Sequence, residues 1–234
     1  MTQRAHAAPL TPTFVTRWIE TLPDVRIEEV APVPATTGIF SADLVNGFLR
    51  EGPLASPRID ALTDPVLRLL NRAWEYGVKH YVFLQDTHTM DNPEFRAYPP
   101  HCIAGTSESE MIPEIGRLPF ANAFHVVEKN SLHPAVETTF NELWDEQRHI
   151  NRAIVIGDCT DLCVNHLAMH LRMRANALGL QQFDVIIPAN CVDTFDIPES
   201  EDLDPGGAHP GDFFHEVFLY HLASNGIRVV NSII

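Results

Sequence analysis

Cys163 is the side chain of this sequence best placed to do chemistry, because it lies at a predicted strand-to-helix junction. Residues 153–156 form a short apolar run that Gly157 ends, and an apolar repeat of helical period begins at Val164. Thr160 is the predicted N-cap of this helix, which places Cys163 in its first turn. Free backbone N–H groups and the helix dipole favour a thiolate there. An inert buried thiol is the competing interpretation, since cysteine is among the most buried residue types.

Two further predicted strands end at a charged residue. Asp43 follows the strand 36–42, and Lys129 follows the strand 120–128. Because the carboxyl ends of parallel strands meet at one rim of a sheet, we expect both residues to lie near Cys163. An aspartate can take the thiol proton, a lysine can stabilise an anion, and a cysteine can attack a carbonyl carbon. Taken singly, Asp43 is also compatible with a turn and Lys129 with a solvated surface charge.

A long loop after the second predicted strand carries four potential metal ligands. Asp86 and His88 are two residues apart, so both can face the same way from an extended segment, and Glu94 and His101 follow. This mixed nitrogen and oxygen set suits Zn²⁺, Fe²⁺ or Mn²⁺, with water in the remaining positions. Each residue alone is compatible with simple exposure to solvent. Their clustering favours a divalent metal ion as cofactor.

The elements that must position these residues alternate along the chain. The alternation predicts an α/β fold: a single domain with a mostly parallel six-stranded sheet, helices on both faces and right-handed crossovers. Residues 1–35, which are rich in proline and polar residues, are predicted to be an N-terminal extension that packs on the surface or on a neighbouring subunit, with a helix at 13–22. The predicted strands are 36–42, 78–85, 120–128, 153–156, 183–189 and 227–231, and the predicted main helices are 57–77, 134–150, 164–178 and 213–222.

Composition narrows the class of protein. The 234 residues are 45% apolar, enough for one large core, and four cysteines are too few for a disulfide framework. We therefore expect reduced thiols and a cytoplasmic protein. The net charge of −15 argues against nucleic acid or an anionic membrane as partner, and no apolar run is long enough to cross a membrane. A homo-oligomer is compatible with this sequence.

Three motifs resemble those of the isochorismatase-like cysteine hydrolases. They are Ser-Ala-Asp-Leu-Val-Asn-Gly-Phe at 41–48, Thr-Asp-Leu-Cys-Val at 160–164, and Gln-Asp-Thr-His at 85–88 with Tyr-Pro-Pro-His-Cys-Ile-Ala-Gly-Thr at 98–106. The third motif resembles the metal-binding segment of the nicotinamidases. Most other members of the family lack this segment. The resemblance runs from residue 36 to the C-terminus and implies a Rossmann-like three-layer sandwich over 36–234.

The resemblance also implies roles for the reactive residues. Asp43 is then the general base, Lys129 its cationic partner and Cys163 the nucleophile. A cis peptide bond between Asp158 and Cys159 is implied as well. It would turn the Cys159 N–H towards the substrate oxygen, beside the N–H of Cys163.

The resemblance further implies a substrate site beside a metal ion, with zinc expected first and iron or manganese as alternatives. The metal would bind Asp86, His88 and His101, and Glu94 lies where some nicotinamidases have a carboxylate ligand. Aromatic side chains at Phe48 and Tyr98 would sandwich a pyridine ring. The sequence departs from the family at two positions: Gly47 stands where an acidic residue is usual, and Tyr98 replaces a tryptophan of one branch.

The implied activity is hydrolysis of nicotinamide to nicotinate and ammonia through a cysteine thioester, a reaction of pyridine nucleotide biosynthesis. Two other functions are compatible with the same sequence. One is a related cysteine hydrolase that acts on another small amide or on an isochorismate-like vinyl ether. The other is a non-catalytic member of the family that binds a ligand or a partner protein.

Overall fold

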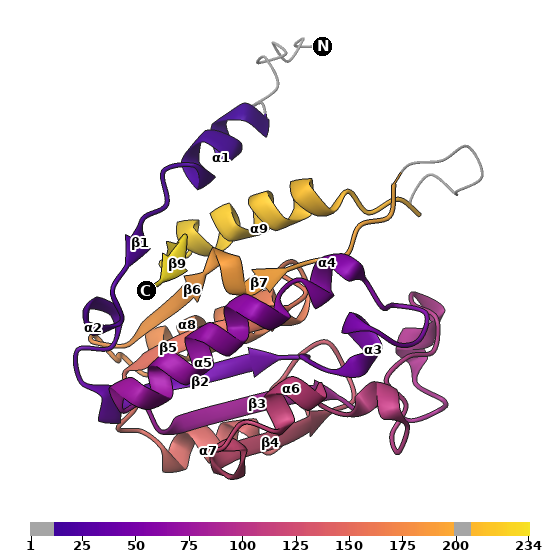
Figure 1. Cartoon of the computed structure of the whole chain (residues 1–234), viewed down its shortest axis with the longest axis horizontal. Coiled ribbons are helices and arrows are strands. Elements are labelled where there is room, and N and C mark those ends of the chain that lie inside the picture. Colours follow the sequence, from indigo (N-terminus) through magenta and orange to yellow (C-terminus); the bar gives the residue numbers. More distant parts are fainter. Residues whose placement is uncertain (1–11, 199–206) are drawn as a thin grey trace.

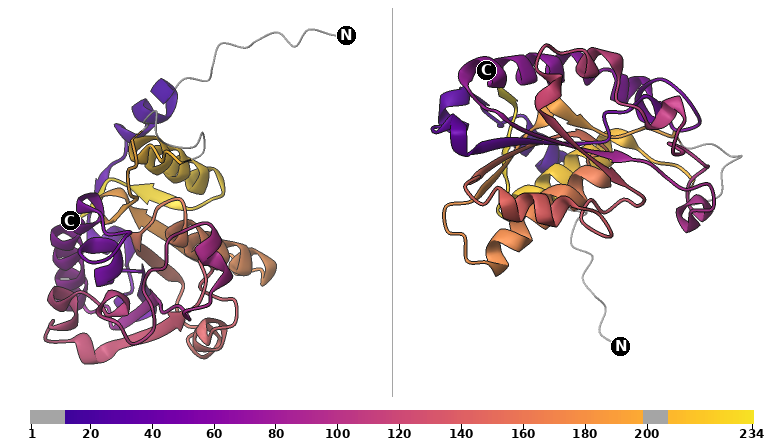
Figure 2. Two further views of the ribbon diagram at one scale, coloured as in Figure 1. Left: turned by 90° about the vertical axis from the view of Figure 1, so that its right-hand side faces the viewer. Right: turned by 90° about the horizontal axis from the view of Figure 1, so that it is seen from below.

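The computed structural model describes residues 12–198 and 207–234, and a parallel sheet between two helical layers organises them (Figures 1 and 2). Every pairing in this sheet is parallel, as the alternating pattern predicts. A short strand, β7 (Val192–Asp193), pairs with the end of β5, so the sheet has one strand more than the predicted six. The other six, in spatial order, are β4 (Phe124–Lys129), β3 (His80–Asp86), β2 (Thr37–Ala42), β5 (Arg152–Asp158), β6 (Asp184–Pro188) and β8 (Arg228–Val230).

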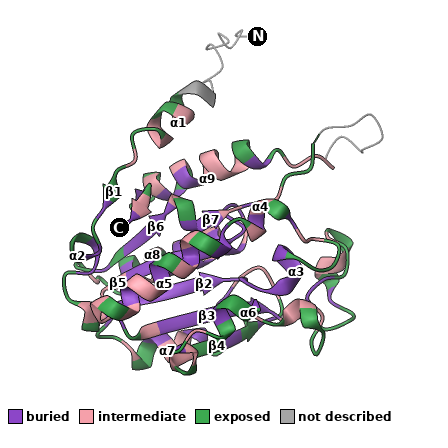
Figure 3. Ribbon diagram, viewed as in Figure 1, coloured by how far each residue is buried: buried purple, intermediate pink, exposed green. Residues whose placement is uncertain are grey.

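Two apolar cores cover the two faces of the sheet, because successive strand residues point to opposite sides. On β2, Ile39 belongs to one core and Phe40 to the other. The first core contains residues of α5 (Thr63–Tyr76) and α6 (Pro113–Gly116), and the second contains residues of α7 (Phe140–Glu146), α8 (Cys163–Ala177) and α9 (Gly211–Ser224). Figure 3 shows the central strands buried between these layers. Short elements between these are α3 (Asn46–Leu49), α4 (Pro57–Asp60), η1 (Pro34–Thr36), η2 (Pro93–Arg96), η3 (Ser107–Ser109), η4 (Ala121–Ala123) and η5 (Ala189–Cys191).

Two predicted helices differ from those observed. The helix predicted at 57–77 is divided into α4 and α5 at residues 61 and 62. The helix predicted at 134–150 is wrong for its first turns, since α7 begins only at Phe140. Glu137 has a φ of +55°, which a right-handed helix does not accept, so the chain turns before α7 can begin.

The segment before β2 does more than lie on the surface. α1 (Pro12–Ile19) packs on α9 through Phe14 and Trp18, which both make edge contacts with Tyr220. β1 (Asp24–Val25) then pairs with β9 (Ser232–Ile233), and Val25 and Ile27, the latter in α2 (Ile27–Val30), are buried in the first core. Residues 24–31 therefore contribute to the folded unit, while 1–11 of the predicted extension lie outside the described residues. None of the described helices is long and apolar enough to cross a membrane.

Candidate active site

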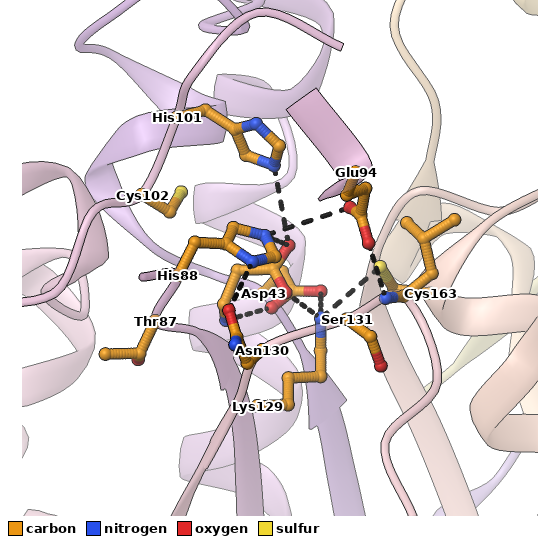
Figure 4. Close-up of polar contacts among 12 residues, drawn as sticks. Asp43, Thr87, His88, Glu94, His101, Cys102, Lys129, Asn130, Ser131 and Cys163 are labelled. Carbon is orange, nitrogen blue, oxygen red and sulfur yellow. Dashed lines mark hydrogen bonds and ion pairs between the residues drawn. The ribbon is translucent and has the colours of Figure 1, made fainter. Parts of the chain in front are cut away.

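The carboxyl edge of the sheet brings the predicted reactive residues together (Figure 4). Asp43 follows β2 directly, Lys129 ends β4, and Cys163 begins α8 after β5. The Lys129 Nζ atom lies 2.8 Å from Asp43 Oδ2 and 3.5 Å from Cys163 Sγ. Asp86, the last residue of β3, also forms an ion pair with Lys129 through Oδ1. The rim convergence expected from the sequence is therefore present, and an acid, an amine and a thiol are in mutual contact.

Backbone geometry fixes the position of Asp43. Its φ is +53°, its N–H donates to Leu84 O at 2.9 Å, and its Oδ1 accepts the Asp86 N–H at 2.7 Å. Behind it, Gly157 in β5 has a φ of +109°, and a Cβ atom there would lie 1.9 Å from Ala42 O. Only glycine allows β5 to pass so close to the end of β2.

Burial sets the electrostatics of this cluster. Desolvation, with the nearby charge of Asp86, raises the pKa of Asp43 to about 6. Desolvation and the Asp43 charge raise the pKa of the Cys163 thiol well above its usual range, although Lys129 opposes this. Burial acts against the Lys129 ammonium, but Asp43 and Asp86 overcome it and raise its pKa. In this structure the cluster is thus a protonated thiol beside a weakly acidic carboxyl group and a fixed cation.

The turn before α8 agrees with the cis peptide bond that the resemblance implies but not with the helix cap predicted from the sequence pattern. The Asp158–Cys159 peptide bond is cis. Within the part of the chain that the structure describes, neither the Cys159 N–H nor the Cys163 N–H has a hydrogen-bond acceptor in the protein. The prediction that Thr160 caps α8 is wrong: Leu162 is the N-cap residue, and Thr160 Oγ1 instead lies 2.9 Å from His215 Nδ1. The Thr160 N–H donates to Asp193 O, which holds this residue away from the helix end.

The four predicted metal ligands also lie together, on the other side of Asp86. His88 Nε2 is 3.5 Å from Asp86 Oδ2 and 3.8 Å from Glu94 Oε1, and His101 Nε2 is 3.9 Å from Asp86 Oδ2. Asp86, His88 and His101 are buried, so the alternative of simple exposure is excluded for them. Asp86 thus belongs to both clusters, with Oδ1 on Lys129 and Oδ2 towards the two imidazoles.

The chemistry of this donor set fits a divalent cation. Asp86 Oδ2, His88 Nε2 and Glu94 Oε1 are buried and have no hydrogen-bond partner within the described residues, although they converge on one point. The opposite edges of the imidazoles are held: His101 Nδ1 lies 2.9 Å from Pro99 O, and His88 Nδ1 lies 2.9 Å from Asn92 Nδ2 and 3.2 Å from Asn130 Oδ1. Such contacts fix the orientation of both rings, with the Nε2 atoms towards Asp86.

Three residues that support the four predicted metal ligands were not predicted from the sequence. Asn130 Oδ1 also accepts the side-chain N–H of Asn92 at 2.7 Å, and Asn92 caps η2 on the loop that carries Glu94. The sequence offered one sign of each role: Asn130 directly follows Lys129, and Asn92 directly precedes Pro93.

Glu108 is the third supporting residue, and its carboxylate accepts the N–H of Cys102, the residue after His101, at 3.0 Å. At Gly47 a Cβ would lie 2.5 Å from Cys102 Sγ, which accounts for the absence of a larger residue there.

A pocket of about 360 Å³, open solvent included, lies over the cysteine and the metal cluster. The predicted aromatic residues Phe48 and Tyr98 both line it, and the Phe48 ring centroid is 5.4 Å from that of His101. The apolar residues that line this pocket were not predicted from the sequence, because they lie in loops with no repeating pattern. These residues are Leu54, Leu132, Leu162 and Phe195.

The fold places this chain among the three-layer α/β proteins with a parallel sheet. Comparison with known proteins narrows the class. The model of the isochorismatase domain family matches residues 37–203, and the chain belongs to this family.

Relatives extend the likeness over most of the chain. Nicotinamidase 1 of Arabidopsis thaliana is 29% identical over 214 residues, which cover 85% of this chain and 87% of that protein. The structure of nicotinamidase PncA from Bacillus subtilis is 28% identical with a TM-score of 0.64, over 83% of this chain and 99% of the other. The pyrazinamidase of Pyrococcus horikoshii, solved in complex with zinc, has a TM-score of 0.61 over 83% of this chain and 98% of that one. At 18% identity it shows a shared fold alone.

Proposed function

We propose that this protein is a metal-assisted cysteine amidohydrolase that converts nicotinamide to nicotinate and ammonia. The observation that carries the proposal is the sharing of Asp86 between the Asp43–Lys129–Cys163 cluster and the histidine cluster, under one small pocket with aromatic walls. The named nicotinamidase relatives support an amide as the substrate.

Acylation begins at Asp43. A carboxylate oxygen of Asp43 lies within 4.8 Å of Cys163 Sγ, and its raised pKa makes it a competent base near neutral pH. Asp43 takes the thiol proton, and the thiolate, stabilised by Lys129, attacks the amide carbon. The backbone N–H groups of Cys159 and Cys163 hold the oxyanion, a role for which they are free. Asp43 returns the proton to nitrogen as the carbon–nitrogen bond breaks, which releases ammonia and leaves a thioester.

Deacylation uses the same groups in reverse. Asp43 takes a proton from water, and the resulting hydroxide attacks the thioester carbon. The carbon–sulfur bond breaks, and the proton passes from Asp43 to Cys163 Sγ. The product leaves as nicotinic acid, which loses its carboxyl proton to water to give nicotinate. Lys129 stays charged throughout, because two buried carboxyl groups hold its proton.

A divalent ion would be held by Asp86, His88 and His101 with Glu94, and the donor set is compatible with Zn²⁺, Fe²⁺ or Mn²⁺. When bound, the ion supplies a Lewis-acid position for the pyridine nitrogen, directly or through water. Phe48 and Tyr98 pack against the ring and orient the carboxamide towards Cys163.

Ammonia release from nicotinamide tests the proposal. The purified protein should release ammonia, chelation should abolish the release, and added Zn²⁺, Mn²⁺ or Fe²⁺ should restore it. Cys163→Ala should be inactive with an unchanged unfolding curve, since the side chain is small and its loss opens little space. Normal activity of Cys163→Ala, or full activity of metal-free protein, would contradict the mechanism.

A further inference from the structure

A second chamber opens beside the catalytic pocket, and nothing in the proposed reaction uses it. Its volume is about 1060 Å³, open solvent included, and on this side its described lining comes from residues 195–197, residues 207–209 and α9. The two spaces share four wall residues, so the chamber adjoins the pocket over Cys163. The shared walls are Leu54, Tyr98, Leu162 and Phe195.

The chamber has flat, apolar walls. The His209 ring is stacked between two phenyl rings, with its centroid 3.9 Å from that of Phe195 and 4.3 Å from that of Phe214, at interplanar angles of 19° and 9°. Ile197 and Phe218 continue the apolar lining, and both retain partial exposure. Such a surface gains free energy by covering apolar or aromatic groups.

Asp161 is the one aspartate or glutamate among the described lining residues of the chamber. It holds His209 Nε2 with Oδ2 at 2.8 Å, while its Oδ1 atom is buried and has no partner among the described residues. No arginine or lysine lines either space in the described part of the chain. Lys129 lies beneath the pocket and is paired with Asp43 and Asp86. An anionic group placed in the chamber would meet the Asp161 carboxylate, with no arginine or lysine among the described lining residues to balance its charge.

We propose that this chamber is a subsite for an uncharged apolar or aromatic substituent of the substrate amide, and that it excludes substituents with a carboxylate. The inference rests on the proposed amidohydrolase function. It widens the substrate class from nicotinamide to ring-substituted neutral amides. It also disfavours the alternative of an anionic vinyl ether as substrate, because no arginine or lysine among the described lining residues would pair with such a group.

A matched substrate series tests the subsite. Nicotinamides that carry a propyl group at each free ring carbon in turn identify the position that faces the chamber. A nicotinamide with a carboxyethyl group at that position is the anionic counterpart of similar size. We expect kcat/KM of the propyl compound to equal or exceed that of nicotinamide, and that of the carboxyethyl compound to be lower by about 100-fold. The proposal is overturned if no ring position tolerates propyl, or if the two substituents are accepted equally.

A substitution that fills the chamber provides a second test of the subsite. Ala208 lines the chamber but not the catalytic pocket, so Ala208→Trp should lower kcat/KM for the propyl compound by about tenfold and leave that for nicotinamide unchanged. Ala177→Trp, at an exposed position of α8 remote from both spaces, is the matched control and should change neither value. Equal effects of Ala208→Trp on both substrates would contradict a separate subsite.

A binding measurement distinguishes failure of this inference from failure of the proposed function. Calorimetry on Cys163→Ala with the same compounds measures their binding affinity in the absence of turnover. Tighter binding of the propyl than of the carboxyethyl compound supports the subsite even if wild-type protein hydrolyses a different amide. Loss of that preference while nicotinamide is turned over rejects the subsite alone.

Discussion

Asp86 is the residue on which both clusters depend. Its two oxygens are divided, with Oδ1 on Lys129 and Oδ2 between His88 and His101, and the side chain has no exposed surface. Lys129 and the two imidazoles stabilise its charged form and lower its pKa, although burial acts in the opposite direction. One carboxylate therefore couples the charge of the catalytic cluster to that of the proposed metal site.

Replacing Asp86 should disturb both functions at once. Asp86→Asn keeps the volume but removes the shared charge, so we expect affinity for Zn²⁺ to fall by at least about tenfold. Turnover should fall with it, since Lys129 loses one of two partners. Chelator competition measures the affinity, and the exposed neighbour Asp91→Asn serves as control. Unchanged zinc affinity in Asp86→Asn would show that this residue is not a ligand.

The raised pKa of Asp43 predicts the acid limb of the pH profile. Asp43 acts as a base only when it is a carboxylate, and burial beside Asp86 raises its pKa to about 6. Below that pH the carboxyl group is protonated and cannot take the thiol proton. We therefore expect kcat/KM to level off about one pH unit above this pKa and to fall about tenfold per pH unit well below it. A profile that is flat from neutral pH down to the usual range of an aspartate would contradict this role.

At the scale of elements, the close approach of β2 and β5 positions Asp43 against the nucleophile turn. Gly157→Ala would place a Cβ 1.9 Å from Ala42 O at a φ of +109°. We expect a loss of at least about 2 kcal/mol in the free energy of unfolding, from strain and forced separation of the strands. Denaturant unfolding measures the loss.

Gly116→Ala is the matched control for that substitution. An added Cβ at residue 116 meets no atom within 4 Å, and the residue lies in α6. Its effect on the free energy of unfolding should be within about 1 kcal/mol. Equal losses for the two variants would show that the strand approach is not the cause.

Sequence patterns predicted the elements well where the pattern is local. The six strands and the rim positions of Asp43, Lys129 and Cys163 follow from apolar runs and the residues that end them, although β4 begins at Phe124 and not at the predicted residue 120. The late start of α7 follows from the positive φ at Glu137, for which a glutamate side chain gives no signal. The sharing of Asp86 was also not predictable, because it depends on side-chain orientation across three strands.

At the scale of the whole molecule, the N-terminal segment closes the fold through contacts that no local pattern reports. β1 and β9 come from opposite ends of the chain and pair in parallel, with Asp24 opposite Ser232. Arg72 in α5 adds a hydrogen bond to Ile233 O at 2.6 Å. Pairing between such distant segments depends on tertiary packing and leaves no local sequence pattern. The composition of residues 1–35 therefore indicated only a peripheral extension.

The burial of Ile27 makes this closure testable. Its side chain is 4% exposed in the first core, so Ile27→Ala should lower the free energy of unfolding by about 2 to 4 kcal/mol. Glu28→Ala, at an exposed neighbour, should change it by less than about 0.5 kcal/mol. Should both variants unfold like the wild type, the segment would be a separate appendage.

In the proposed reaction Cys163, assisted by Asp43 and Lys129, carries the acyl group of an amide. Rapid acid quench of the protein with nicotinamide, followed by mass spectrometry of the intact chain and its peptides, detects such a group. We expect a nicotinoyl group on Cys163 that disappears as ammonia release is completed, with none on Cys159, Cys102 or Cys191. Turnover of nicotinamide without any acyl group on Cys163, or an equal yield of ammonia from Cys163→Ala, would contradict it.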